Sequence, residues 1–236
     1  MSGPDALTRS VLADQVKERL LEAILDGSYP ADSRIVETAV AKELGTSQAP
    51  VREALRGLEA LGIVEITPFR GARVRRLDVA ELLEAYVVRS AIEVLGARLA
   101  VARLTDEDVA ALVSLGADMR TAADAGDSRA LAIVDASFHE KIMSLSGNST
   151  LLRVWRSLEP MSRTYITLVG PNSDPQWTCG LHDPILEAVH RRDADAVVSA
   201  IEHHFDEVRE RLAGSLAEVA EQQDHAAAQQ PATGTS

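Results

Sequence analysis

The hydrophobic pattern of residues 34–76 predicts two short helices and then a pair of strands. The first helix has apolar positions spaced for one face and stops at Gly45. These positions are Val40, Ala41 and Leu44. Ser47 stands where an N-cap would open the second helix, over about residues 48–61. Two helices joined by a tight glycine-containing turn form a helix-turn-helix unit.

The second of these helices has an apolar stripe and a separate polar stripe. The apolar stripe consists of Val51, Leu55, Leu58 and Leu61. Gln48, Arg52 and Arg56 recur at positions i, i+4 and i+8 on another face. Pro50 lies in the first turn, where its missing N–H costs nothing. Because a helix N-terminus with nearby arginines suits phosphates and base edges, this face is interpreted as a DNA-reading surface.

Two short apolar runs after the second helix predict a β-hairpin, or wing, with Arg70 at its tip. The runs are residues 63–66 and 72–74. An arginine stripe alone is usually a solvated face, and helix-turn-helix shapes also occur in proteins that bind no DNA. The combination of turn, stripe and arginine-tipped wing favours DNA binding. The expected DNA-binding residues are Ser47, Gln48, Ala49, Arg52, Arg56, Arg70 and Gly71.

The residues of this unit also resemble a known family. The run LGTSQAPVREALR at 44–56, with Leu58, Glu59 and Gly62 after it, resembles the winged-helix domain of GntR-type transcriptional regulators. The position of Gln48 is more often Arg in that family. Since Gln pairs naturally with adenine and Arg with guanine, we expect a different operator base at that step.

The rest of the chain predicts a second, entirely helical domain. Residues 1–9 are expected to be flexible, and a supporting helix from about residue 10 completes a DNA-binding domain that ends at residue 76. From Asp78, a candidate N-cap, apolar residues recur at helical spacing up to about residue 220. The expected fold is therefore mainly α, with a winged helix-turn-helix followed by an all-α bundle of six or seven helices. Residues 221–236 are expected to be a disordered tail.

Charge is distributed unevenly between the two predicted domains. The whole chain carries a net charge of −12, which is unusual for a DNA-binding protein. Residues 1–76 contain 11 basic and 11 acidic residues, which leaves 13 of the chain's 24 basic and 25 of its 36 acidic residues for the second domain. This distribution indicates that only the N-terminal domain meets DNA, and that specific contacts supply much of the affinity.

Cysteine content and hydropathy bear on the compartment. Cys179 is the one cysteine, so an internal disulfide framework is excluded, as is typical of a reducing compartment. No run of about eighteen apolar residues and no basic-then-apolar leader occurs. We therefore expect a soluble, cytoplasmic protein with no membrane partner.

Four polar residues of the second domain form a candidate metal site. Asp135 and His139 are separated by one helical turn and can converge on one point. His182 and His204 lie at corresponding depths if the last two helices run antiparallel. One carboxylate and three imidazoles suit a divalent ion such as Zn²⁺, Ni²⁺ or Mn²⁺. Spacing alone leaves an ordinary set of hydrogen-bonded histidines equally open, and His190, His203 and His225 are assigned to that class.

A second resemblance covers this domain. The order and spacing of Asp135, His139, His182 and His204 are similar to those of the FCD domain, the ligand-sensing half of the FadR subfamily of GntR regulators. The resemblance implies that these four residues hold the metal. It also implies an inward-facing Arg89 that can grip an anion, with Arg163 as a second candidate for effector binding.

These patterns together predict a metabolite-responsive transcription factor, a repressor, that binds a pseudo-palindromic operator as a homodimer. Its effector is expected to be a small carboxylate bound beside the metal. One alternative is a zinc-dependent hydrolase that uses the Asp/His₃ site, although no further carboxylate is placed as a general base. Another is a protein-interaction module that uses the winged helix as a docking surface.

Overall fold

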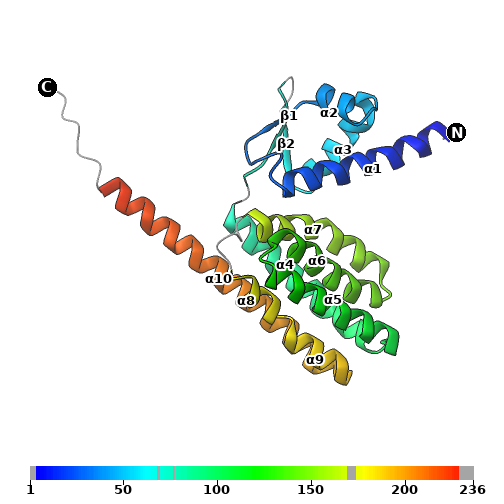
Figure 1. The fold of residues 1–236 in the computed structure, drawn as a ribbon, viewed down its shortest axis with the longest axis vertical. Helices are drawn as coiled ribbons and strands as arrows, with labels where there is room; N and C mark the ends of the chain where they lie inside the picture. The colour runs from blue at the N-terminus through cyan, green and yellow to red at the C-terminus, as the bar shows by residue number, and fades with distance from the viewer. Residues whose placement is uncertain (1–3, 68–69, 77, 169–173, 229–236) are drawn as a thin grey trace.

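The computed structural model describes residues 4–67, 70–76, 78–168 and 174–228, and Figure 1 shows a small mixed domain beside a helical one. The predicted fold class is confirmed: the chain is mainly α, with a winged helix-turn-helix and an all-α bundle. The first domain, here called the head, comprises α1 (Pro4–Leu25), β1 (Arg34–Ile35), α2 (Glu37–Glu43), α3 (Gln48–Ala60), β2 (Val64–Thr67) and β3 (Gly71–Val74).

The bundle follows the head directly. Over the described residues it has seven helices, at the upper end of the predicted number. They are α4 (Val79–Val101), α5 (Asp106–Asp124), α6 (Ser128–Leu145), α7 (Ser149–Leu168), α8 (Pro175–Gly180), α9 (Asp183–Arg191) and α10 (Ala194–Ala228). Short polar breaks separate them, and two of the expected caps are present. Asp78 accepts from the amide of Ala80, and Thr105 forms a capping box with Asp108.

Each helix of the helix-turn-helix is followed by a glycine with a positive φ. Gly45 and Gly62 have φ values of +63° and +73°, in the left-handed region that glycine adopts without a Cβ penalty. After α2, the amide of Thr46 donates to the carbonyl of Ala41, which closes a Schellman motif. The equivalent bond after α3 runs from Ile63 to Leu58. Both helices therefore end where the sequence predicts.

The wing is a three-stranded antiparallel sheet in the order β1-β3-β2. The predicted hairpin is β2 and β3, whereas β1 was not foreseen because two residues give no periodic signal. One face of the sheet packs onto the helices through Ile35, Ala72 and Val74. The opposite face is solvent-exposed and carries Arg34 and Arg73. This alternation fixes which side chains can reach a ligand outside the head.

Both ends of the chain contain more helix than expected. Helix α1 begins at Pro4, within the segment that the sequence predicts to be flexible, and proline suits the first helical position. Helix α10 continues to Ala228 and extends beyond the bundle in Figure 1. Helix α10 thus runs into the segment from residue 221 that the sequence predicts to be a tail, where alanine and glutamine are compatible with a helix. Residues 229–236 lie outside the described part.

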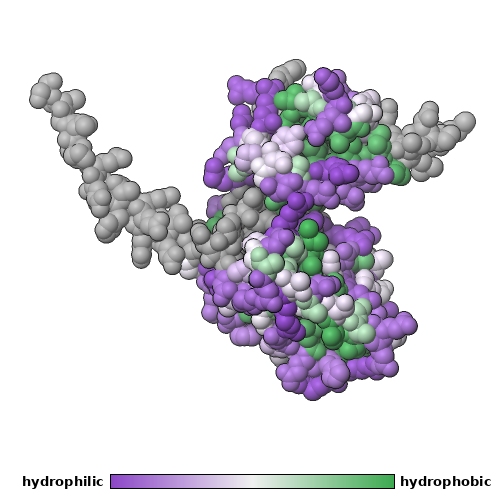
Figure 2. All heavy atoms as spheres, in the orientation of Figure 1, coloured by the Kyte–Doolittle hydropathy of each residue, from purple (hydrophilic) through white to green (hydrophobic). Residues whose placement is uncertain are grey.

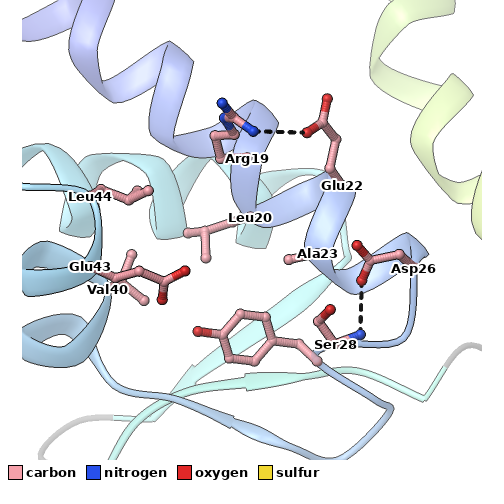
Figure 3. A pocket seen from close by; sticks show the side chains of 10 residues that line it. Arg19, Leu20, Glu22, Ala23, Asp26, Ser28, Val40, Glu43 and Leu44 are labelled. Carbon is pink, nitrogen blue, oxygen red and sulfur yellow. Dashed lines mark hydrogen bonds and ion pairs between the residues drawn. The ribbon is translucent and has the colours of Figure 1, made fainter.

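One apolar residue of the predicted turn is not in the core. Val40 and Ala41 are buried, but Leu44 is exposed because it caps α2 instead of lying within it. Figure 3 shows Leu44 at the edge of an open groove between α1 and α2, whose lining also includes Leu20 and Glu43. This groove is in the head, away from the histidines of the bundle.

Head and bundle are joined by polar and apolar contacts. Arg75, which follows β3, donates through Nη1 to the carbonyl of Gly62 at 3.0 Å and through Nη2 to Glu81 of α4 at 2.7 Å. A Cβ at Gly62 would lie 3.6 Å from the Cε atom of Met161 of α7. Asp26, just after α1, lies 3.8 Å from Arg129 of α6. The head therefore rests on three different helices of the bundle.

None of the helices in the described ranges is both long enough and apolar enough to cross a membrane.

The left-handed turn at Gly45 predicts a stability difference between two glycine substitutions. Gly45→Ala should lower the free energy of unfolding by about 1–2 kcal/mol, because the new Cβ is strained at this positive φ. Gly214→Ala, in the middle of α10 with open space around it, is the matched control and should stabilise by up to about 1 kcal/mol. Urea unfolding followed by circular dichroism measures both. Equal effects of the two substitutions would contradict this account of the turn.

Candidate DNA-reading face and candidate metal centre

The outward side of α3 carries the polar residues expected to read DNA. Gln48, Arg52 and Arg56 are all exposed, while the opposite side of the helix is buried in the head core. The buried side consists of Pro50, Val51, Ala54, Leu55 and Leu58. Ala49 is half-buried beside this face. Ser47 occupies the N-cap position but makes no side-chain capping bond, so its exposed hydroxyl is not committed to the helix end.

Arg52 is held in place by a residue that the sequence did not single out. Its Nη2 donates to Glu37 Oε2 at 2.9 Å, and its Nε donates to the same oxygen at 3.2 Å. Glu37 is the first residue of α2, so the pair links the two helices of the motif. The Arg52 side chain remains 52% exposed. The guanidinium is thus oriented by the protein and still accessible from outside.

At the wing, Arg70 is exposed in the turn between β2 and β3, with its amide bonded to the carbonyl of Thr67 at 3.0 Å. Gly71 begins β3 and is half-buried. Pro68 and Phe69, which complete the predicted tip, lie outside the described residues. The reading helix and the wing belong to one compact core, because Leu58 and Ala72 are members of the same buried cluster.

The four predicted metal ligands come together inside the bundle, all buried. Asp135 and His139 lie one turn apart on α6, His204 lies on α10, and His182 is the residue just before α9. The candidate ligand nitrogens of the three histidines lie within 4.8 Å of one another. Asp135 Oδ1 lies 3.1 Å from His182 Nε2 and 3.9 Å from His139 Nε2.

Hydrogen bonds on the outer side of two rings fix which nitrogens face inward. His139 Nδ1 lies 2.5 Å from the Glu93 carboxylate, and His182 Nδ1 lies 3.1 Å from the Thr178 carbonyl. Both acceptors lack a proton, so each Nδ1 donates and each Nε2 is left to act inside the cluster. The two Nε2 atoms are 3.2 Å apart. This separation is one that two nitrogen ligands of the same metal ion can adopt.

The protonation states also favour cation binding. Burial lowers the pKa of His204 well below its ordinary value, and the nearby His182 and His139 lower it further. Burial alone would raise the pKa of Asp135, but its contact with His182 and the nearby His139 and Arg89 bring it below its usual range. The cluster therefore combines a neutral imidazole with an ionised carboxylate, which are the forms that coordinate metals.

The residue that organises this cluster, Glu93, was missed in the sequence. Its Oε1 accepts from Arg89 Nε and from Trp155 Nε1, both at 2.6 Å, while Oε2 receives His139. Burial opposes its ionisation, but the charge of Arg89 and these donors lower the pKa of Glu93 to about 2. The i, i+4 spacing of Arg89 and Glu93 could have indicated the pair. Nothing in the local sequence pointed to Trp155.

The two arginines proposed for effector binding have different surroundings. Arg89 is 3% exposed, and its guanidinium carbon lies 5.5 Å from the ring centres of both Trp155 and Phe205. Its Nη2 is buried and has no hydrogen-bond partner among the described residues. Arg163 is half-buried and pairs with Glu159 on the same helix at 2.8 Å. Arg89 is thus a buried guanidinium on the helix of Glu93, the carboxylate that also binds His139.

A DNA-reading helix with a wing, attached to a helical domain with an internal polar centre, defines the class of protein: a DNA-binding transcriptional regulator rather than an enzyme. Comparison with known families agrees. Residues 12–74 match the family of bacterial regulatory proteins called gntR, and residues 84–207 match the FCD domain. The chain belongs to the GntR family and carries an FCD domain.

Individual relatives match this chain over most of both sequences. The chain is 34% identical over 198 residues to the probable D-xylose utilization operon transcriptional repressor of Paenarthrobacter nicotinovorans, with 84% of this chain and 87% of that protein covered. It is 26% identical over 213 residues to the gluconate operon transcriptional repressor of Bacillus licheniformis, with 87% of each covered. These relatives are repressors, and they give no support to the hydrolase alternative.

Solved structures share the fold. The E. coli protein McbR/YncC superimposes with a TM-score of 0.77 at 22% identity, covering 87% of this chain and 98% of that one. A putative GntR regulator from Rhodococcus sp. RHA1 gives a TM-score of 0.72 at 21% identity, covering 86% and 97%. The arrangement of head and bundle is therefore one that solved proteins adopt.

Proposed function

We propose that this GntR-type regulator is a metabolite-responsive repressor of the FadR subfamily, which binds a pseudo-palindromic operator as a homodimer. The observation that carries the proposal is the exposed polar stripe of α3 beside the arginine-tipped wing, on a head that is connected to a buried polar centre. In this proposal Gln48 and Arg52 enter the major groove, and Arg70 enters the minor groove. Ser47 and Ala49 lie beside the reading residues, and Arg56 and Gly71 complete the surface.

Glu37 gives the proposed reading arginine a defined direction before DNA arrives. The carboxylate engages Nε and Nη2 of Arg52, so the side chain loses less conformational freedom when it binds a base. An arginine that contacts guanine does so through two N–H groups of fixed geometry. The neighbouring Gln48, which lacks a charge, matches adenine instead.

The buried cluster is proposed to hold one divalent ion through Asp135, His139, His182 and His204. Support comes from the convergence of their ligand atoms and from the outer hydrogen bonds of His139 and His182. Zn²⁺, Ni²⁺ and Mn²⁺ all accept this combination of nitrogen and oxygen ligands. Such an ion supplies positive charge for an anionic effector.

The proposed effector is a small carboxylate bound between the metal and Arg89. The free Nη2 of Arg89 is a buried donor without a partner among the described residues, and leaving such a group unpaired costs about 1–3 kcal/mol. A carboxylate oxygen would satisfy it. Arg163, which pairs with Glu159 on α7, is proposed as a second contact. One relative is named for a gluconate operon, and gluconate is itself a carboxylate.

The homodimer is proposed to form through α4 of the bundle. Val88, Leu95 and Leu99 lie at helical spacing on one side of α4, and between 37% and 49% of each is exposed. Val154 of α7, which packs beside α4, is 41% exposed. Figure 2 shows apolar side chains also at the surface of the head and on the side of the bundle that faces the viewer. A second copy is the proposed partner because a two-fold operator needs two heads.

The reading helix is tested by selecting bound duplexes from a random DNA pool and then titrating the best sequence by fluorescence anisotropy. Arg52→Ala should weaken specific binding by about 1–3 kcal/mol. Arg191→Ala, at the exposed end of α9, is the control and should bind as the wild type does. Repeating the titration with small organic acids tests the effector. The assignment of α3 as the reading helix would be refuted by a wild type that shows no sequence preference, or by an Arg52→Ala variant with unchanged affinity.

The metal proposal predicts about one divalent ion per purified chain after loading with Zn²⁺ or Ni²⁺, measured by metal analysis. Glu93→Gln should reduce metal affinity by about 10–100-fold, because the outer partner of His139 is weakened. Glu140→Gln is the control: it breaks an exposed ion pair with Arg156 and should leave metal affinity unchanged. If the loaded wild type retains no metal, the histidines are packing residues.

The dimer proposal predicts two chains per particle in sedimentation velocity. Leu95→Glu should shift the protein to one chain, because a charge would be buried at the interface. Val113→Glu, at an equally exposed site on α5, should remain dimeric. A wild-type monomer would refute the dimer. A Leu95→Glu variant that remains dimeric would show that the interface does not include this face of α4.

A further inference from the structure

The outer face of the wing brings together two arginines that are far apart in sequence. Arg34 of β1 is the direct cross-strand partner of Arg73 of β3, and both side chains are exposed. Like charges placed directly opposite each other destabilise an antiparallel pair. The sheet therefore retains an unfavourable contact that a neutral residue at position 34 would remove.

Arg73 has compensating partners, whereas Arg34 has none in the described part of the chain. Glu65 of β2 lies opposite Arg73 on its other side, and Arg73 Nη1 donates to the carbonyl of Asp32 at 2.5 Å. The carboxylate of Asp32 is already bound by Arg76 at 2.8 Å. Within the described ranges, no hydrogen bond or ion pair engages the guanidinium of Arg34. Its charge is thus available to a ligand.

The Arg34 side chain reaches the tip of the wing instead of lying along β1. A Cβ atom at Gly71 would be 3.5 Å from Arg34 Nε and 3.7 Å from Nη2. Gly71 directly follows Arg70, which is exposed in the hairpin turn. Arg34 of β1 and Arg70 of the hairpin turn, more than thirty residues apart in sequence, therefore lie at the same end of the sheet.

We propose that Arg34 binds a phosphate of the DNA backbone beside the groove that the wing enters, as a contact separate from the α3 reading face. A guanidinium fork matches the geometry of a phosphate, and the anion would offset the repulsion between Arg34 and Arg73. The inference rests on the proposed placement of the wing against DNA. It adds β1 to the DNA-binding surface and gives a role to a charge that has no partner among the described residues.

The test compares full-length wild type and Arg34→Gln in binding to the selected operator and to an unrelated duplex, over about 50 to 200 mM KCl. The slope of log K against log[KCl] should become shallower by about 0.9 per bound chain, because one phosphate contact is lost. Affinity should fall by the same factor for both duplexes, since a phosphate contact carries no sequence information. Arg34→Lys, which keeps the charge, should retain the wild-type slope.

Two further measurements separate binding from a structural role. The urea midpoint of free Arg34→Gln protein should equal or exceed that of the wild type, because the cross-strand repulsion is relieved. Arg191→Gln on α9 should leave both the slope and the affinity unchanged. A lower urea midpoint with an unchanged slope would show that Arg34 only supports the sheet, and would overturn the inference.

Other results also decide the question. An unchanged slope in Arg34→Gln, with normal operator recognition by the wild type, would refute the phosphate contact while leaving the repressor proposal intact. A loss confined to duplexes with A·T pairs at the flanks would indicate base reading in the minor groove and would overturn the phosphate assignment. A wild type without sequence preference would instead be a failure of the proposed function.

Discussion

The bundle depends on one buried carboxylate. Glu93 of α4 is fully buried and accepts hydrogen bonds from Arg89 on its own helix, from His139 on α6 and from Trp155 on α7. An ionised group inside a protein is tolerated only when donors replace the lost water, and here three donors do so. The same bonds fix the direction of an imidazole and of a guanidinium. The stability of the bundle and the geometry of the polar centre therefore both depend on the Glu93 carboxylate.

Local features of the structure could be predicted from the sequence because interactions between neighbouring residues determine them. The glycine after α2, the caps at Asp78 and Thr105, and the alternation in the wing each involve residues within a few positions of one another. The ends of the helical regions were less accurate. Helix α1 begins before its apolar pattern does, and α10 outlasts its own, and the residues of those turns are compatible with a helix by their intrinsic propensity.

The polar centre could be predicted only in part. The i, i+4 spacing of Asp135 and His139 places them on one face of any helix, but the approach of His182 and His204 depends on how separate helices pack. His182 in fact lies before α9, where the short helix α8 supplies the carbonyl of Thr178. Trp155 reaches Glu93 from 62 positions away, and the pair between Glu37 and Arg52 also crosses between helices. No periodicity in a single sequence records such contacts.

The double engagement of Arg75 has a mechanical consequence. Its Nη1 donates to the carbonyl of Gly62, just after the reading helix ends. Its Nη2 donates to Glu81 in the first turn of α4, the helix that also carries Glu93. A movement of the first turn of α4 that carried Glu81 away from Gly62 would therefore break one of these bonds. This side-chain bridge gives the head an attachment to α4 besides the peptide backbone, at the point where the chain leaves the recognition helix for the wing.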